Sequence, residues 1–298
     1  MPATIALPTG EIMPGELSVA FQGDKLWEAY QRLGALAEAL GFGVVSVYAD
    51  LGFQPAIAPL LAIARATRRV RLGPAALNPY LLHPVEIAGQ IAALDAASGG
   101  RAWLGLARGA WLDALGIDDA RPLARLREAI AVIRLVLARE SGGFAGSFYR
   151  LPEEPLLRYA PLRPRVPLLI GAWGPRMLEL AGELADEVKI GGSANPDLIP
   201  WVRHRLAVGE RRAGRAEGSV GIVVGAVTVV DLDGDAARER ARQEAARYLP
   251  VVAPLDPTVV VDRGDLARMA RLVAVGDDDA AASGAPAEPR AASASLSA

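Results

Sequence analysis

The stretch VRLGPAALNPYLLHPVEIAGQIAALDAA, residues 70–97, contains the unit from which the rest of the chain is built. Residues 70–77 form an apolar run that is typical of a buried strand. Pro79 and Pro84 end that run, and Pro84 also suits the first turn of a helix because its φ is fixed. A helix is expected from Pro84 to Ala97. The stretch therefore predicts a strand, a polar loop and a helix in succession.

The same alternation recurs along most of the chain. Near-continuous apolar strands that alternate with helices are typical of a parallel sheet covered by helices, and so many units favour a barrel over an open sheet. The predicted fold class is α/β, a TIM (β/α)8-like barrel of parallel strands. The expected strand and helix pairs are residues 17–21 and 25–40, 44–49 and 57–67, 70–77 and 84–97, 102–107 and 122–138, 168–171 and 176–185, 188–190 and 196–213, and 220–230 and 235–248.

Two regions fall outside this alternation. Residues 141–165 are rich in Gly, Phe, Tyr and Pro, which predicts an insertion in the barrel domain rather than part of its wall. Residues 277–298 are of low complexity and are expected to be a disordered tail. The barrel domain would then span residues 1–276. No convincing eighth strand follows residues 220–230, so the barrel is expected to be incomplete, as a premature stop or a shifted reading frame would explain.

Composition excludes several classes of function. The chain has 298 residues, of which 52% are hydrophobic, and a formal net charge of −2 without a long basic stripe, so nucleic acid is not an expected partner. It has no cysteine and two distant histidines, which argues against a metal centre. The first residues do not resemble a signal peptide, and the longest apolar run, 221–230, is far shorter than the roughly 20 residues that span a bilayer. A cytoplasmic protein without membrane contact is expected.

Small residues follow several predicted strands, at the edge where ligands bind in parallel α/β proteins. The loop after residues 168–171 leads into a helix, whose first N–H groups and dipole would stabilise an anionic phosphate, although the same residues could simply form a tight turn. A second loop, after residues 188–190, would let a bulky ligand approach the backbone closely, or would be a plain turn. These candidate cofactor-binding residues are Gly171, Ala172, Trp173, Gly174 and Pro175 in the first loop and Gly191 and Gly192 in the second.

Charged and polar candidates follow three other strands. Arg108, between Ala107 and Gly109, could bind a phosphate or carboxylate, or could form an ion pair at the rim. Asp50 ends the second strand and is a candidate catalytic carboxylate, with a solvated loop residue as the alternative. His83 is a second catalytic candidate, although a histidine next to a helix start more often packs or caps. Pro74 lies inside a predicted strand and cannot donate to a ladder, which predicts a bulge there.

The residues NPY (78–80) with HP (83–84), SGGR (98–101) and GAWGP (171–175) together carry a resemblance. From about Glu16 to about Ala274 the chain resembles the luciferase-like flavin-dependent oxidoreductases. Within them it is similar to the coenzyme F420-dependent branch typified by the methylenetetrahydromethanopterin reductases.

This resemblance implies a metal-free barrel that binds F420, an 8-hydroxy-5-deazaflavin, at the carboxyl end of its strands. It further implies hydride transfer between F420 and a small organic substrate, and a homodimer. A cis peptide is expected near Gly73 and Pro74, pressed against the ring, with Asn78 and Tyr80 over the ring edge. FMN is the alternative cofactor, in a luciferase-like monooxygenase. A non-catalytic barrel that has lost its last strand is a third possibility. Leu51 stands where sugar-phosphate dehydrogenases of the group have histidine, which argues against their chemistry.

Overall fold

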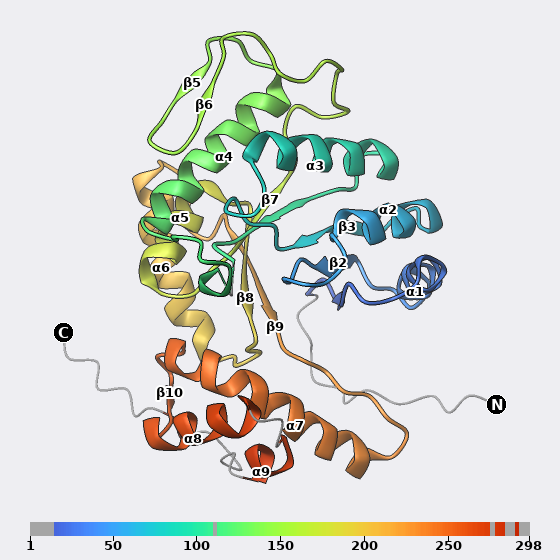
Figure 1. The fold of residues 1–298 in the computed structure, drawn as a ribbon, viewed down its shortest axis with the longest axis vertical. Helices are drawn as coiled ribbons and strands as arrows, with labels where there is room; N and C mark the ends of the chain where they lie inside the picture. Colours follow the sequence, from blue (N-terminus) through green and yellow to red (C-terminus); the bar gives the residue numbers. More distant parts are fainter. Residues whose placement is uncertain (1–14, 110–111, 275–277, 284–289, 292–298) are drawn as a thin grey trace. The chain divides into compact units, whose positions relative to one another are not determined.

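The computed structural model describes residues 15–109, 112–274, 278–283 and 290–291 (Figure 1). The described part divides into two compact units. The first unit comprises the described residues of 1–104, 109–117 and 131–166. The second comprises those of 105–108, 118–130 and 167–298.

The first unit is built on a parallel sheet with strand order β1-β2-β3. Helix α1 packs on α2, and α2 packs on α3. The expected strands and helices all appear in this unit, with strands that are one to three residues shorter than predicted because their ends turn into loops. The bounds are β1 (Ser18–Phe21), α1 (Trp27–Ala39), β2 (Val44–Tyr48), α2 (Ile57–Ala66), β3 (Arg71–Ala75) and α3 (Pro84–Ser98).

Arg101 shows why the SGGR segment is needed in this unit. Its guanidinium donates to the carbonyl oxygens of Ala64 and Thr67 at 3.1 Å each, where α2 ends, and to that of Val70 at 2.7 Å. The carbonyls of Ala64 and Thr67 lie in the last turn of α2 and lack partners within the helix, so a cation at this end stabilises it. Gly99, with a φ of 67°, ends α3 in the left-handed conformation that glycine adopts without strain. The segment therefore ties the ends of two helices to the start of β3.

The second unit contains the sheet β4-β7-β8-β9, in which β7, β8 and β9 run parallel in register. Helices α5 and α6 lie side by side, because Gly182 and Gly209 let their backbones approach. The bounds are β4 (Leu104–Leu106), η1 (Asp113–Leu115), α4 (Pro122–Ala138), β7 (Leu168–Gly171), α5 (Pro175–Leu184), β8 (Glu187–Gly191), α6 (Leu198–Arg212) and β9 (Gly221–Gly225); η1 and part of α4 belong to the first unit.

The segment at 141–165 forms a hairpin of β5 (Phe144–Ala145) and β6 (Arg150–Leu151), which pair antiparallel and belong to the first unit. Arg163 joins the end of this segment to the unit by an ion pair with Asp95, which is 1% exposed, and by a hydrogen bond to the carbonyl of Ala102 at 2.7 Å. The hairpin therefore pairs apart from the parallel sheets, and its status as an insertion in the barrel domain stays a prediction.

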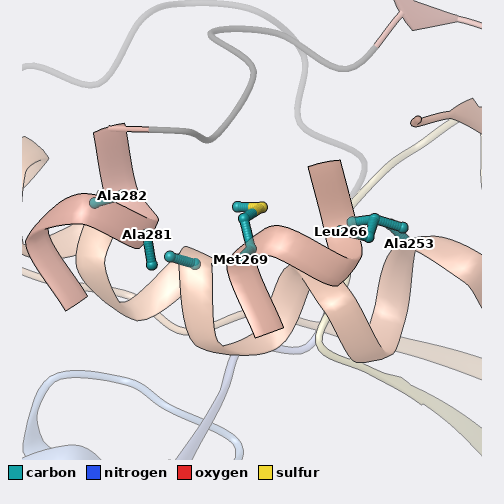
Figure 2. Packing of buried hydrophobic residues seen from close by; sticks show 6 residues of the cluster. Ala253, Leu266, Met269, Ala281 and Ala282 are labelled. Atoms are coloured by element: carbon teal, nitrogen blue, oxygen red, sulfur yellow. The ribbon is translucent and has the colours of Figure 1, made fainter. Parts of the chain in front are cut away.

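After β9 the chain forms a group of helices. These are α7 (Gly234–Val252), η2 (Ala253–Leu255), α8 (Arg263–Ala274) and α9 (Asp278–Ser283). Their apolar cluster is shown in Figure 2: Ala253, Leu266, Met269, Ala281 and Ala282 are all buried, together with Ala246. The expectation of a disordered tail therefore differs from the structure at residues 278–283, because two alanines of α9 complete this cluster. The tail's other residues, apart from 290–291, lie outside the described part.

Among the described residues, no strand after β9 joins the parallel sheets. The next strand, β10 (Val259–Val260), pairs antiparallel with β11 (Arg290–Ala291) instead. Within the same part of the chain, no helix combines the length and apolarity that crossing a membrane requires.

Candidate cofactor-binding site

Strand β3 ends at a cis peptide between Ala75 and Ala76, in the position that the resemblance predicts. On the β2 side there is no bulge at Pro74, because the register is unbroken: Pro74 pairs with Val47 and Ala75 with Tyr48. On the opposite side of β3, the described pairing is a single bridge at Leu72. Pro74 has no backbone N–H, so the pairing that starts with the bridge at Leu72 cannot be extended through a hydrogen bond donated by residue 74.

Gly73 serves packing within the first unit. A Cβ at this position would lie 2.3 Å from the carbonyl oxygen of Trp103 and 2.5 Å from its indole ring. A side chain of any size would therefore displace Trp103, which is 4% exposed. The predicted role of Gly73 in cofactor binding stays a prediction, and the structure supplies a second reason for the glycine.

Asn78 is buried in the loop after β3, with 6% of its surface exposed. Its Oδ1 accepts hydrogen bonds from the backbone N–H groups of Tyr80 at 3.1 Å and Leu81 at 2.9 Å. Those two donors identify the oxygen and leave the amide NH2 as the donor at the other end of the group. Gly109, with a φ of 92°, lies against this NH2, since a Cβ there would be 2.8 Å from Nδ2. The structure thus brings Asn78 and Gly109 together.

His83 caps α3. Its Nδ1 accepts from the backbone N–H of Val85 at 3.3 Å, and its ring is perpendicular to that of Tyr149 with centroids 5.4 Å apart. Tyr149, from the insertion, also donates its hydroxyl to the carbonyl of Pro79 at 2.9 Å. The geometry agrees with the capping alternative for His83. Sequence reasoning missed Tyr149, because nothing near it in the sequence indicates a contact 70 residues away.

Asp50 lies half-buried just beyond the end of β2, beside the exit of β3. The side-chain amide of Gln22, which follows β1, donates to Asp50 Oδ2 at 3.2 Å. This contact joins two neighbouring strand ends and orients the carboxylate. The sequence did not predict a role for Gln22, because a lone glutamine after a strand has no distinctive pattern.

In the second unit, the loop after β7 leads directly into α5, as predicted. Pro175 is the first helical residue and Gly174, with a φ of 79°, is the N-cap. Glycine has no side chain to accept from the first N–H groups of the helix, so these groups can donate to an anion. Ala172 is different: its N–H donates to the carbonyl of Lys189 at 3.1 Å and is used within the sheet.

The loops after β7 and β8 contact each other. The indole Nε1 of Trp173 donates to the carbonyl of Gly191 at 3.0 Å. A Cβ at Gly191 would meet none of the described atoms within 4 Å, so a ligand could approach this backbone. Gly192 differs, because a Cβ there would lie 2.7 Å from Val252. The two adjacent glycines therefore have different reasons to be small.

The loop after β4 contains the candidate residues Ala107 and Arg108. Ala107 lies beside Gly171, where an added Cβ would be 3.2 Å from that of Ala107, so the small residues of two strand ends pack together. Arg108 forms an ion pair with Asp119. This agrees with the rim alternative for Arg108, and its role in binding an anion stays a prediction. The structure thus assembles Asn78, Gly109, Tyr80 and His83 in one unit and Ala107, Gly171, Trp173 and Gly191 in the other.

Known proteins resemble the chain over most of its length. A family model for luciferase-like monooxygenases matches residues 12–294. The 5,10-methylenetetrahydromethanopterin reductase of Archaeoglobus fulgidus is 31% identical over 251 residues, 84% of this chain and 74% of that protein. The F420-dependent glucose-6-phosphate dehydrogenase of Nakamurella multipartita is 32% identical over 227 residues, 71% of this chain and 65% of that protein.

A solved structure shows the same fold. The coenzyme F420-dependent tetrahydromethanopterin reductase from Methanopyrus kandleri superposes with a TM-score of 0.81 at 24% identity, covering 91% of this chain and 83% of that one. The predicted α/β fold class, that of the luciferase-like TIM barrels with their parallel strands, is confirmed. Because the family model matches nearly the whole chain and a relative is 31% identical over 84% of it, the chain belongs to the luciferase-like monooxygenase family.

Proposed function

We propose that this chain transfers a hydride between coenzyme F420 and a small organic substrate. That it is an oxidoreductase follows from its family. The observation that carries the proposal is the sequence identity to such relatives, 31% over 84% of this chain for the methylenetetrahydromethanopterin reductase and 32% over 71% for the F420-dependent dehydrogenase. When bound, F420 would supply the carbon that accepts or donates the hydride.

The geometry of the strand ends fits such a cofactor in two respects. The exit of β3 offers a buried amide donor, Asn78 Nδ2, of the kind that can bind a ring carbonyl or nitrogen. The start of α5 offers backbone N–H groups for a phosphate, and Gly191 offers close approach to the backbone. Asp50, oriented by Gln22, is the candidate catalytic residue, whereas His83 caps a helix.

A second candidate is an FMN-dependent monooxygenase, which the description of the matching family favours. FMN and F420 share a tricyclic ring and a phosphate, so the same residues could bind either. A barrel without activity is the third possibility from the sequence. The predicted homodimer, cytoplasmic location and barrel domain at 1–276 stay predictions, and so does disorder for the residues of 277–298 that lie outside the described part.

Titration of the purified protein with F420 and with FMN, followed by visible absorbance, separates these functions. We expect saturable binding of F420 that is at least tenfold tighter than that of FMN. Tighter binding of FMN would support the monooxygenase. If the protein binds neither F420 nor FMN, both proposed enzyme functions are contradicted.

Asn78→Asp tests the site itself. Aspartate keeps the oxygen that accepts from Tyr80 and Leu81 but replaces the NH2 donor with a second acceptor, so the loop should persist while a bond to the ring is lost. We expect about tenfold weaker F420 binding, or about 1.4 kcal/mol. Asp231→Asn is the matched control, since it too keeps an Oδ1 that accepts from a backbone N–H, that of Asp233 at 3.0 Å, on an exposed loop. Equal affinities of the two variants would remove Asn78 from the site.

A further inference from the structure

The loop after β8 is held by a network that reaches it from far along the chain. Asn195 donates its Nδ2 to Asp256 Oδ2 at 3.3 Å and to Thr258 Oγ1 at 2.8 Å. Asp256 is only 5% exposed, and its other oxygen accepts from the backbone N–H of Thr258 at 2.8 Å and from the Thr258 hydroxyl at 2.5 Å. A buried carboxylate with its acceptors used in this way is well placed to hold one geometry.

Asn195 is engaged on its other side as well. Its Oδ1 accepts from the backbone N–H of Asp197 at 3.1 Å, just before α6 begins, and its own N–H donates to Ser193 Oγ at 3.2 Å. The carbonyl of Ser193 in turn accepts from the N–H of Gly225 at 3.1 Å, at the end of β9. The loop is therefore anchored at three points within the second unit.

Packing supports the same contact. Gly192 lies against Val252, the last residue of α7, so closely that a Cβ would meet the valine methyl at 2.7 Å. Ala253, the next residue, belongs to the apolar cluster with Leu266 and Met269 (Figure 2). The helical group after β9 thus fixes the position of Asp256, three residues after Ala253, through the packing of this cluster.

The loop needs such an anchor because its own residues give it little rigidity. Gly191 and Gly192 have more backbone freedom than other residues, and ordering them costs more conformational entropy. A cofactor that binds only the ordered loop has its apparent affinity reduced by the fraction of time that the loop is disordered. Whatever orders the loop in advance therefore increases affinity without contacting the ligand.

We infer that Asp256 and Asn195 are positioning residues, through which the helical group after β9 holds Gly191 ready for the cofactor. This inference rests on the proposed function, since it takes the loop after β8 to bind F420. Neither residue touches the cofactor itself; Asp256 acts through Asn195, and Asn195 acts through the loop backbone.

A pair of substitutions and their combination test this inference. Asp256→Asn sets two NH2 groups against each other, and Asn195→Asp sets two carboxylates against each other. The double variant exchanges the roles, so that the amide at 256 donates to the carboxylate at 195. We expect each single variant to bind F420 about tenfold more weakly, and the double variant to recover most of the affinity.

The matched control is Asp262→Asn, in the same helical group. Asp262 Oδ1 accepts from the N–H groups of Gly264 at 2.7 Å and Asp265 at 3.1 Å, and asparagine keeps that oxygen, but this side chain has no role in the loop. Its F420 affinity should equal that of the unchanged protein. Hydrogen exchange of the amides of residues 191–197 is the second measurement, and it needs no cofactor. We expect faster exchange in both single variants and protection in the double variant and the control.

The outcomes separate the two proposals. Slow exchange in the single variants would overturn the anchoring network, and fast exchange with unchanged F420 affinity would overturn the positioning role while leaving the proposed function intact. If the unchanged protein does not bind F420, the proposed function fails and the positioning role fails with it. Both proposals are supported if the single variants bind F420 weakly, the double variant recovers the affinity and the control binds F420 as tightly as the unchanged protein.

Discussion

Glu210 offers a sharp test of how the second unit is held together. It lies in α6, is fully buried, and accepts from the backbone N–H groups of Gly218 and Val220, each at 2.8 Å, and from the hydroxyl of Ser219 at 3.2 Å. One carboxylate thereby fixes the turn that leads into β9. Glu210→Gln keeps the shape but turns one acceptor oxygen into an NH2 group, which leaves one of the two backbone donors without a partner.

The size of the effect follows from these contacts. A buried donor without a partner costs about 1–3 kcal/mol, and a hydrogen bond to a charged acceptor is stronger than a neutral one by about 1 kcal/mol. We therefore expect Glu210→Gln to lower the free energy of unfolding by about 3 kcal/mol. For a chain of this size that corresponds to roughly 6–12 °C in Tm. Thermal and urea unfolding, followed by circular dichroism, measure both.

The stability difference between Glu210→Gln and the unchanged protein should also depend on pH. Burial by itself raises the pKa of Glu210, but the hydrogen bonds from Val220, Gly218 and Ser219 outweigh it, and the pKa is held below its ordinary value of 4.5. A carboxyl whose pKa is lowered on folding stabilises the protein fully above its unfolded pKa and loses that contribution as pH falls through the folded pKa. The gap between Glu210→Gln and the unchanged protein should be constant from pH 7 to 5.5 and should narrow below pH 4.5.

Glu217→Gln is the matched control. Glu217 makes an exposed ion pair with Arg211 at 2.6 Å, with 58% of its side chain exposed, and such pairs contribute little. Its loss should change stability by less than about 0.5 kcal/mol. Equal stability of the two glutamine variants at pH 7 would refute the assignment of Glu210 as the anchor of this turn.

Two further substitutions test packing and a loop contact. Gly209→Ala would place a Cβ 1.9 Å from the carbonyl oxygen of Glu179 and should lower the free energy of unfolding in urea by about 1–3 kcal/mol or more. The control is Gly89→Ala in the middle of α3, where the new Cβ would meet no described atom within 4 Å. This variant should be more stable by about 0.5–1 kcal/mol. If both changes were equally harmful, close contact between α5 and α6 would not be the cause. Tyr149→Phe removes the hydroxyl that binds the carbonyl of Pro79 and should cost about 1 kcal/mol in thermal unfolding, with faster hydrogen exchange at residues 78–83. The exposed Tyr159→Phe should change neither quantity, and the same loss in both variants would contradict a specific contact at Pro79.

The order of strands and helices could be read from the sequence alone. Apolar runs that alternate with helical patterns specify burial of both faces of each strand, and this property depends on neighbours in the sequence. The same holds for local turn chemistry: Pro84 begins a helix where predicted, and the helix expected from residue 176 begins one residue earlier, at Pro175. Local pattern also predicted that a site would lie in the loops at the strand ends.

Which residue does what at those ends depended on the tertiary structure. Gly73 and Gly192 have no local feature that distinguishes them from Gly191, yet an added Cβ would meet Trp103 at the first and Val252 at the second, and no described atom within 4 Å at the third. The disorder predicted for the tail likewise overlooked the packing of α9 on helices already formed.

The side chains that anchor the loops could not be predicted from the sequence, because their contacts join residues that are far apart in the chain. Gln22 meets Asp50, Tyr149 meets Pro79 and Asp256 meets Asn195 across 28, 70 and 61 residues. A hydrogen bond between distant residues leaves no periodicity in the chain, because it depends on where two loops meet after the strands have paired. The sequence by itself therefore determined the order of strands and helices and the strand ends at which the site is proposed, and only the tertiary structure decided which side chains hold those strand ends in place.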